Sequence, residues 1–204
     1  MAEPQTPTHS RAADGGGIGM TPAAAPSRPR WRPGDRRPDI ASMARVDQAG
    51  EYGATRIYAG QLAVLGAHPA ARVIARMQSQ ERRHLRHFDD MLVERGIRPT
   101  LLQPFWNIAG HALGAATALL GPSAAMACTA AVETEIDKHY DEQIRSLGED
   151  EPELAASIRE FQLEELEHRD TALAAGAEDT FGYPILSSLI RAGCRLAIGL
   201  SKRI

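Results

Sequence analysis

Two Glu-x-x-His pairs are the residues of this chain whose types and spacing are best suited to chemistry. Glu81 and His84 form the first pair, and Glu165 and His168 form the second. Each pair interrupts apolar positions that recur every three or four residues, which places them on one helix face. Burying a carboxylate and an imidazole is costly unless something compensates them, and side chains at i and i+3 can reach one metal ion. A single pair is common on solvated helices, whereas two pairs on apolar faces favour a metal site.

Two single glutamates complete the set of candidate ligands. Glu51 and Glu133 lie in predicted helices that precede the helices of the two pairs. Gly66 is the midpoint between Glu51 and Glu81, and Glu149 is the corresponding midpoint of the second half, so both midpoints fall in predicted turns. Residues at equal distances from the turn of an antiparallel hairpin lie at the same height, here roughly 22 Å from it at about 1.5 Å per residue. The sequence therefore predicts an internal repeat whose carboxylates and imidazoles converge at mid-bundle.

The donor atoms of this set suit iron or manganese. Carboxylate oxygens and imidazole nitrogens are donors that these metals accept, and the lack of thiolates disfavours an iron–sulfur cluster or a structural zinc site. The same ligand set occurs in di-iron and di-manganese helical bundles. A bundle with buried Glu–Arg or Glu–His pairs is the alternative, but no comparable set of basic residues lies on the inner faces. The expected metal ligands are Glu51, Glu81, His84, Glu133, Glu165 and His168.

Six helical segments are expected to position these residues, and no segment shows the period-two alternation of a strand. They cover residues 38–65, 69–95, 104–120, 123–147, a stretch from Asp150 as N-cap to about 175, and 184–204. The predicted fold is all-α: a ferritin-like helical bundle with four metal-binding helices plus two membrane-associating amphipathic helices. Residues 1–37, rich in Pro, Gly, Ala, Ser and Arg, are expected to form a disordered tail, and residues 38–204 one di-iron bundle domain.

The composition limits the classes of function. A chain of 204 residues can bury one sizeable core, and its formal net charge of −3 gives no reason to expect nucleic acid as a partner. Cys128 and Cys194 form no Cys-x-x-Cys pair. We expect both to be small buried side chains in a reducing compartment. No basic segment followed by an apolar one is present near the start, so no secretory signal is expected.

Two segments are expected to contact a membrane without crossing it. The run from Phe105 to Leu120 is the most apolar stretch of the chain, but a span needs about 20 apolar residues. The sixth segment combines apolar positions with basic ones, as in a helix that lies in a membrane interface. Its basic residues, expected to meet lipid headgroups, are Arg191, Arg195, Lys202 and Arg203. The alternative that both segments make ordinary core or oligomer contacts stays open.

The residues around the candidate ligands resemble a known family. Residues 45–54, RVDQAGEYGA, are similar to the first-helix motif of the demethoxyubiquinone hydroxylase family. Residues 127–133 are similar to its fourth-helix motif and residues 164–168 to its fifth. Residues 192–198 look like the family's C-terminal helix. The resemblance covers essentially residues 38–204.

The resemblance implies an enzyme of ubiquinone biosynthesis. The expected reaction is that of a 3-demethoxyubiquinol 3-hydroxylase, a di-iron monooxygenase that uses O2 to hydroxylate the ring of a membrane-resident polyprenyl quinol. Each chain would hold two iron ions, the first by Glu51, Glu81 and His84 and the second by Glu133, Glu165 and His168, with Glu81 and Glu165 bridging. NADH or the quinol itself would be the reductant, and other proteins of ubiquinone synthesis are candidate partners.

The resemblance also implies a location. The expected location is peripheral, on the inner face of a bacterial cell membrane or on the matrix side of the mitochondrial inner membrane. The sequence departs from the family where Gln48 replaces the common His and Asp141 replaces the common Asn. Neither residue is an expected ligand, so both departures concern the surroundings of the metal site.

His139 and Tyr140 are the candidate catalytic residues outside the ligand set. They lie two turns past Glu133, where they could relay electrons or protons between substrate and iron. A core tyrosine beside a histidine that merely supports the ligands is an equal alternative. The bundle itself is also compatible with iron storage, a peroxidase, a manganese catalase or a non-enzymatic quinone-binding adaptor. The complete ligand set disfavours the adaptor, and the apolar third and sixth segments disfavour a soluble storage cage.

Overall fold

The structure, a computed structural model, describes Met1, residues 39–149 and residues 151–203. In these ranges the chain forms six α-helices and one short 3-10 helix, with no strand. The predicted all-α fold is therefore confirmed, and the tail predicted for residues 1–37 lies, apart from Met1, outside the described residues. The elements are α1 (Ile40–Leu65), α2 (Pro69–Glu94), α3 (Gln103–Leu119), α4 (Pro122–Leu147), α5 (Pro152–Ala174), η1 (Ala177–Asp179) and α6 (Tyr183–Ser201).

The helix boundaries agree with the predicted ones to within a few residues, and the differences have local causes. The N-cap of α5 is Glu151, whose side chain makes no capping bond. Its carboxylate is instead bound by Arg95, with an N–O distance of 3.0 Å. Asp150, the predicted cap, lies outside the described residues. The helix α6 begins at Tyr183, so that Pro184 falls in the first turn, where its missing N–H costs nothing.

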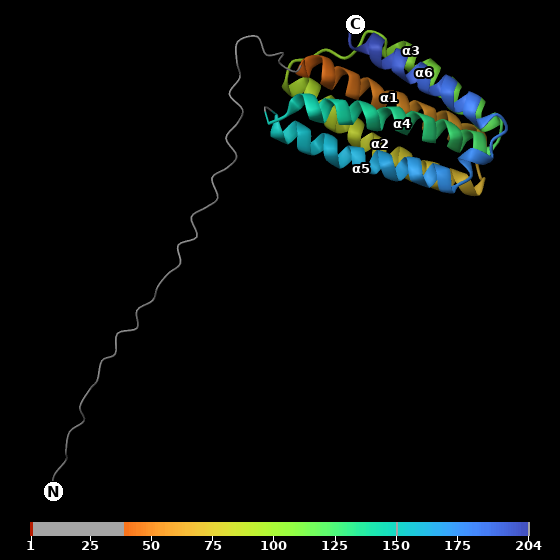
Figure 1. Ribbon diagram of the computed structural model, residues 1–204, viewed down its shortest axis with the longest axis horizontal. Coiled ribbons are helices and arrows are strands. Elements are labelled where there is room, and N and C mark those ends of the chain that lie inside the picture. Colours follow the sequence, from red (N-terminus) through yellow and green to blue (C-terminus); the bar gives the residue numbers. More distant parts are fainter. Residues whose placement is uncertain (2–38, 150, 204) are drawn as a thin grey trace. The chain divides into compact units, whose positions relative to one another are not determined.

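Two antiparallel hairpins, α1–α2 and α4–α5, make up the four-helix bundle (Figure 1). Each hairpin turns at a glycine in the left-handed region: Gly66 has φ 49° and Gly148 has φ 54°. A side chain would strain the backbone there, so glycine at both places ends the first helix of each hairpin at an equivalent position. The twofold repeat seen in the sequence is thus a repeat of hairpins.

The core of the bundle consists of two apolar clusters separated by a polar middle. One cluster lies towards the α1–α2 turn and includes Tyr58, Ile74, Met77, Met126 and Ala172. The other lies towards the α4–α5 turn, at the opposite end of the bundle, and includes Phe88, Tyr140, Leu147, Ile158 and Phe161. The candidate metal ligands occupy the layer between them. Apolar packing on both sides keeps water away from this layer.

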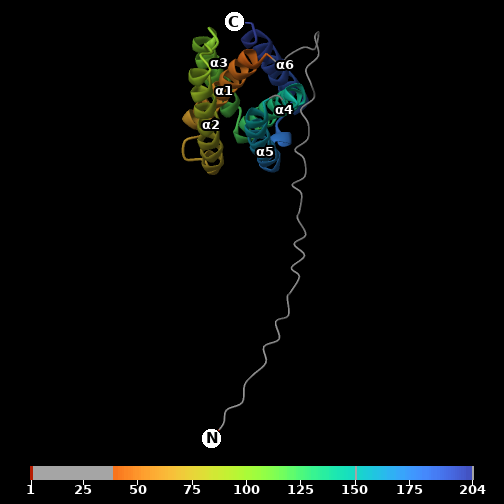
Figure 2. The ribbon, with the colours of Figure 1, turned by 90° about the vertical axis from the view of Figure 1, so that its left-hand side faces the viewer.

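The helices α3 and α6 cover one side of the bundle, α3 beside α1 and α6 beside α4 (Figure 2). The helices α3 and α1 pack so closely at two glycines that their backbones are in direct contact. A Cβ atom on Gly114 would lie 1.9 Å from the carbonyl oxygen of Ile57, and one on Gly60 would lie 2.1 Å from that of His111. Any side chain at these glycines would force the two helices apart.

The apolar surface predicted for α3 and α6 is exposed. The large exposed side chains include Phe105, Ile108, Leu119, Ile185 and Leu189. None of the helices in the described ranges is long and apolar enough to cross a membrane.

The basic residues of α6 differ from expectation. Arg191 and Arg195 both bind the buried carboxylate of Glu135 on α4. They are therefore only partly available to lipid headgroups, because a buried carboxylate with few other partners attracts nearby cations.

We predict that Gly114→Ala destabilises the protein by about 1–3 kcal/mol, because its methyl group would overlap the α1 backbone. Urea unfolding of the metal-free protein measures the loss. Gly199→Ala is the matched control, since nothing lies within 4 Å of the added Cβ atom. That change should stabilise α6 by about 0.5–1 kcal/mol. Equal effects of the two substitutions would contradict close packing of α3 on α1.

Candidate metal centre

The structure brings all six predicted ligands together in the middle layer of the bundle. They form two overlapping groups, and within each group one donor atom per residue lies within 4.8 Å of the others. The two groups are Glu51, Glu81, His84 and Glu165, and Glu81, Glu133, Glu165 and His168. Glu81 and Glu165 belong to both, as expected of ligands that bridge two ions. The equal distances from the hairpin turns bring the donors to one level.

Burial makes these six residues hard to explain without a cation. Each is at most 2% exposed. Removing a carboxylate from water costs on the order of several kcal/mol when nothing compensates its charge. Several donors that face the shared space make no hydrogen bond. They are both oxygens of Glu81, Oε2 of Glu51 and of Glu133, Oε1 of Glu165, and Nδ1 of His84. Hard oxygen and imidazole donors left free in a buried site fit iron or manganese.

The electrostatics of the site also indicate that it binds a cation. Burial raises the pKa of Glu81 and Glu133 well above the usual range, and the neighbouring carboxylates raise it further. Burial also acts on Glu165, but the hydrogen bond with His168 and the close contact with the His84 imidazole lower its pKa to about 2. Carboxylates this close repel one another unless protons or cations lie between them. A site that attracts protons strongly for this reason also attracts metal ions.

Two tyrosines form hydrogen bonds to Glu51 and Glu133, the glutamates that belong to only one of the two groups. The hydroxyl of Tyr58 donates a hydrogen bond to Oε1 of Glu133 at 2.8 Å. The hydroxyl of Tyr140 donates to Oε1 of Glu51. Each tyrosine follows its own helix's glutamate by seven residues and binds the glutamate of the other helix. Tyr58 is a site residue that the sequence reasoning missed, and this repeated spacing of two helical turns was the available signal.

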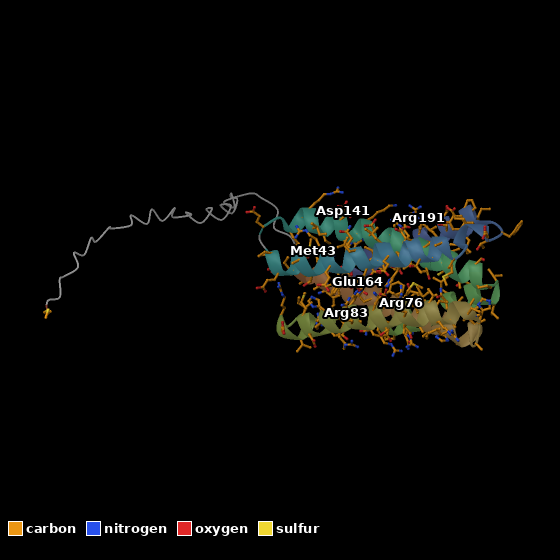
Figure 3. The ribbon with its side chains drawn as sticks, turned by 90° about the horizontal axis from the view of Figure 1, so that it is seen from below. Met43, Arg76, Arg83, Asp141, Glu164 and Arg191 are labelled. Atoms are coloured by element: carbon orange, nitrogen blue, oxygen red, sulfur yellow. The ribbon has the colours of Figure 1, made fainter. Side chains whose placement is uncertain are left out.

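The outer nitrogen of each imidazole is also held. Nε2 of His84 lies 2.9 Å from Oε2 of Glu164, and Nε2 of His168 lies 3.1 Å from Oε1 of Gln80. These contacts orient the rings so that Nδ1 faces the centre. Arg83 in turn binds Glu164 across the α2–α5 interface (Figure 3).

Glu164 and Gln80 were not predicted from the sequence. Each directly precedes the glutamate of a Glu-x-x-His pair. A polar residue at that position of both pairs was the available signal.

His139 and Tyr140, predicted as a relay, have different surroundings. Tyr140 touches a candidate ligand, whereas His139 does not. Nε2 of His139 lies 3.4 Å from Oδ1 of Asp47 and 2.9 Å from Nε2 of Gln143. Burial raises the pKa of Asp47. His139 and Gln143 line a polar surface pocket of about 300 Å³, so His139 lies between water and the buried Asp47.

The two departures from the family pattern lie off the ligands. Gln48 donates a hydrogen bond to Asp89 at 3.0 Å. Asp141 is partly exposed and pairs with Arg145 on the same helix. Neither side chain contacts a candidate ligand.

An apolar cavity of about 440 Å³ lies on the other side of α1 and α4 from α2 and α5. It is bounded by α1, α3, α4 and α6. Gly50 and Val132 are among its lining residues, and they directly precede the ligands Glu51 and Glu133. The cavity therefore extends to the helix positions next to two of the six candidate ligands. A flat apolar ring is the kind of molecule that such a cavity accepts.

We predict that bound divalent metal stabilises the protein more at higher pH. The raised pKa values of Glu81 and Glu133 stabilise the metal-free fold at low pH, and this contribution is lost as pH rises. Metal binding needs the deprotonated carboxylates and so improves over the same range. The difference in melting temperature between Mn²⁺-loaded and metal-free protein should widen from about pH 5.5 to about pH 8. A difference independent of pH would count against these ligands.

Comparisons with known proteins agree with the residue pattern. A sequence model of the family described as "Ubiquinone biosynthesis protein COQ7" matches residues 38–201. The "3-demethoxyubiquinol 3-hydroxylase" of Rhodospirillum rubrum is 54% identical over 175 residues, which cover 84% of this chain and 82% of that protein. The "NADPH-dependent 3-demethoxyubiquinone 3-hydroxylase, mitochondrial" of Homo sapiens is 52% identical over 172 residues, covering 82% of this chain and 79% of that protein. This chain, whose four-helix bundle brings six Glu and His residues together, therefore belongs to the COQ7 family of ubiquinone biosynthesis proteins.

Proposed function

We propose that this chain is a 3-demethoxyubiquinol 3-hydroxylase, an oxidoreductase of the monooxygenase type that acts in ubiquinone biosynthesis. The observation that carries the proposal is the layer of six buried candidate ligands, two of which, Glu51 and Glu133, directly follow residues that line an apolar cavity. The names of relatives at 52–54% identity give the substrate, a quinol ring without one methoxy group. Hydroxylation replaces a ring C–H by C–OH, and the second oxygen atom of O2 leaves as water after uptake of two electrons and two protons.

The proposed cofactor is a pair of iron ions per chain. Glu51, Glu81 and His84 would hold one ion, Glu133, Glu165 and His168 the other, with Glu81 and Glu165 bridging. Bound iron would supply the reductive activation of O2. The relatives of Bos taurus and Homo sapiens are named NADPH-dependent. For this chain we propose a reduced nicotinamide, NADH or NADPH, or the quinol itself as the source of electrons.

The chain's own residues prepare the site for this reaction. The two apolar clusters exclude water from the ligand layer, and the cavity would hold the ring against α1 and α4. The hydrogen bonds from Tyr58 and Tyr140 fix the two unshared glutamates. Burial raises the pKa of both phenols well above the usual range, which keeps them protonated as donors.

We further propose that His139 and Tyr140 take part in a relay from water. His139 faces the polar pocket and Asp47, while Tyr140 faces Glu51. Protons taken up during turnover have this path from the surface to the ligand shell. A core tyrosine with a supporting histidine is the alternative, and His139→Gln, which leaves the hydrogen bond from Tyr140 to Glu51 in place, separates the two. A relay loses turnover with iron retained, whereas a packing role leaves turnover intact.

We propose that α3 and α6 rest on a membrane, with the protein peripheral rather than spanning. The exposed apolar side chains of both helices flank the cavity, and a polyprenyl quinol resides in the bilayer. Several relatives are named mitochondrial, including that of Saccharomyces cerevisiae. The proposed location is accordingly the matrix side of the inner membrane in a eukaryotic cell, or the cytoplasmic side of a bacterial cell membrane. Other proteins of ubiquinone synthesis are candidate partners there.

The reaction is tested in cells and with purified protein. Cells that lack the protein should accumulate demethoxyubiquinone and lose ubiquinone, and the wild-type chain should restore it. Glu51→Ala and His168→Ala should fail to restore it, because each removes a ligand. The purified wild type should bind about two irons per chain by the ligand count. Normal ubiquinone in the deletion strain, with no second hydroxylase present, would disprove the assigned reaction.

Membrane association has a separate test. The wild type should sediment with phospholipid vesicles, and the double substitution Ile108→Glu with Leu189→Glu should not, because both side chains are exposed apolar residues. Val93→Glu is the control, since Val93 is exposed on α2, away from α3 and α6. A wild type that stays wholly in solution would rule out the proposed surface.

A further inference from the structure

The two helices that wall the apolar cavity are attached to the bundle in different ways. Backbone contact at Gly60 and Gly114 leaves α3 no room to move against α1. On α6, by contrast, nothing lies within 4 Å of a Cβ added to Gly193 or Gly199. Only Ser187, Ile190 and Ser201 of α6 are buried. The contacts of α6 are therefore side-chain contacts, which can form and break while both helices stay intact.

Glu135 on α4 makes the central polar contact to α6. Its side chain is only 4% exposed, and it binds Nε of Arg191 at 2.7 Å and Nη1 of Arg195 at 3.2 Å. Lys138 also binds it, at 3.1 Å, but lies on α4 itself. Three cations thus surround this buried carboxylate, and two of them belong to α6. Among the described residues, the other polar side-chain bond to α6 runs from Ser42 to the carbonyl of Lys202 at the helix end.

We propose that Glu135 is a positioning residue for the substrate: with Arg191 and Arg195 it holds α6 as the movable wall of the apolar cavity, while α3 is the fixed wall. This inference rests on the proposed function, since it assigns the cavity to the quinol ring. A ring that carries a polyprenyl tail must enter through the side of the cavity that faces the membrane. Displacing α6 opens that side without disturbing the metal centre, because none of the six ligands lies on α3 or α6.

Glu135, Arg191 and Arg195 form an ionic clamp between α4 and α6, and residues next to all three line the cavity. The residue after Glu135, Ile136, lines the cavity from α4. Ile190 and Cys194, which directly precede Arg191 and Arg195 in α6, line it from the opposite wall. A change in the ionic contact therefore changes the distance between these apolar surfaces. Substrate binding should respond to such a change, while chemistry at the ligands should not.

The test uses the full-length, iron-loaded protein on phospholipid vesicles and the variant Glu135→Gln. Amide hydrogen exchange within α6 should become about tenfold faster, with α3 unchanged. The KM for the quinol should rise about fivefold or more, while kcat and iron content stay within about twofold of the wild type. A residue that merely stabilised the fold would alter iron content and exchange throughout the bundle.

Two matched variants serve as controls on the same helix. Asp141→Asn removes a carboxylate of α4 that pairs only within that helix and lies away from Arg191 (Figure 3). Lys138→Gln removes the cation that does not link the two helices. Both should behave like the wild type. If Glu135→Gln fails to fold, Arg191→Gln, which leaves Arg195 in place, should show the same changes at smaller size.

The outcomes separate the clamp from the proposed reaction. If Glu135→Gln shows the same hydrogen exchange and the same KM as Asp141→Asn, the proposed clamp is wrong. It is also wrong if exchange of α6 becomes faster while the KM stays unchanged. Absence of quinol hydroxylation by the wild type refutes the proposed function. In that case the exchange experiment still decides whether Glu135 restrains α6.

Discussion

The burial of four carboxylates and two imidazoles in one layer of a helical bundle is the constraint on which the rest of the structure depends. Such a layer is stable only if cations or protons balance its charge and if hydrogen bonds satisfy the atoms that face outward. The chain provides the second condition with Tyr58, Tyr140, Gln80 and Glu164. Apolar clusters above and below the layer then keep water from competing with these contacts.

The internal repeat explains how one chain assembles such a layer. Each hairpin supplies one glutamate, one Glu-x-x-His pair and one tyrosine, and each tyrosine binds the glutamate of the other hairpin. Neither hairpin can therefore satisfy its own ligands. The imidazoles follow the same rule, because His84 of α2 is held by Glu164 of α5, and His168 of α5 by Gln80 of α2. The polar layer thus fixes how the hairpins pair, whereas apolar packing alone would allow sliding.

The sequence predicted the parts of this architecture that depend on spacing within a helix or across a turn. The six helices, the two hairpins and the convergence of six ligands all follow from helical periodicity and from the equal distances to Gly66 and Glu149. The supporting contacts could not be predicted in the same way, because they join residues of different helices that lie far apart in the sequence. The pairing of Arg191 with Glu135 is one example, since the basic residues of α6 have the pattern of a lipid-facing helix when that helix is considered alone. His139 was predicted to form a relay with Tyr140, and the spacing alone could not show that its side chain faces Asp47 rather than the candidate ligands.

In the helices α1 and α4, neighbouring positions serve the metal layer and the apolar cavity, and this limits how the protein can vary. Glu51 of α1 and Glu133 of α4 lie in the metal layer, and the residues just before them, Gly50 and Val132, line the apolar cavity. A larger side chain at Gly50 or Val132 would therefore occupy part of the cavity directly beside a candidate ligand. The cavity can therefore change shape with least effect on the candidate ligands at its lining residues in α3 and α6, because neither helix carries a candidate ligand.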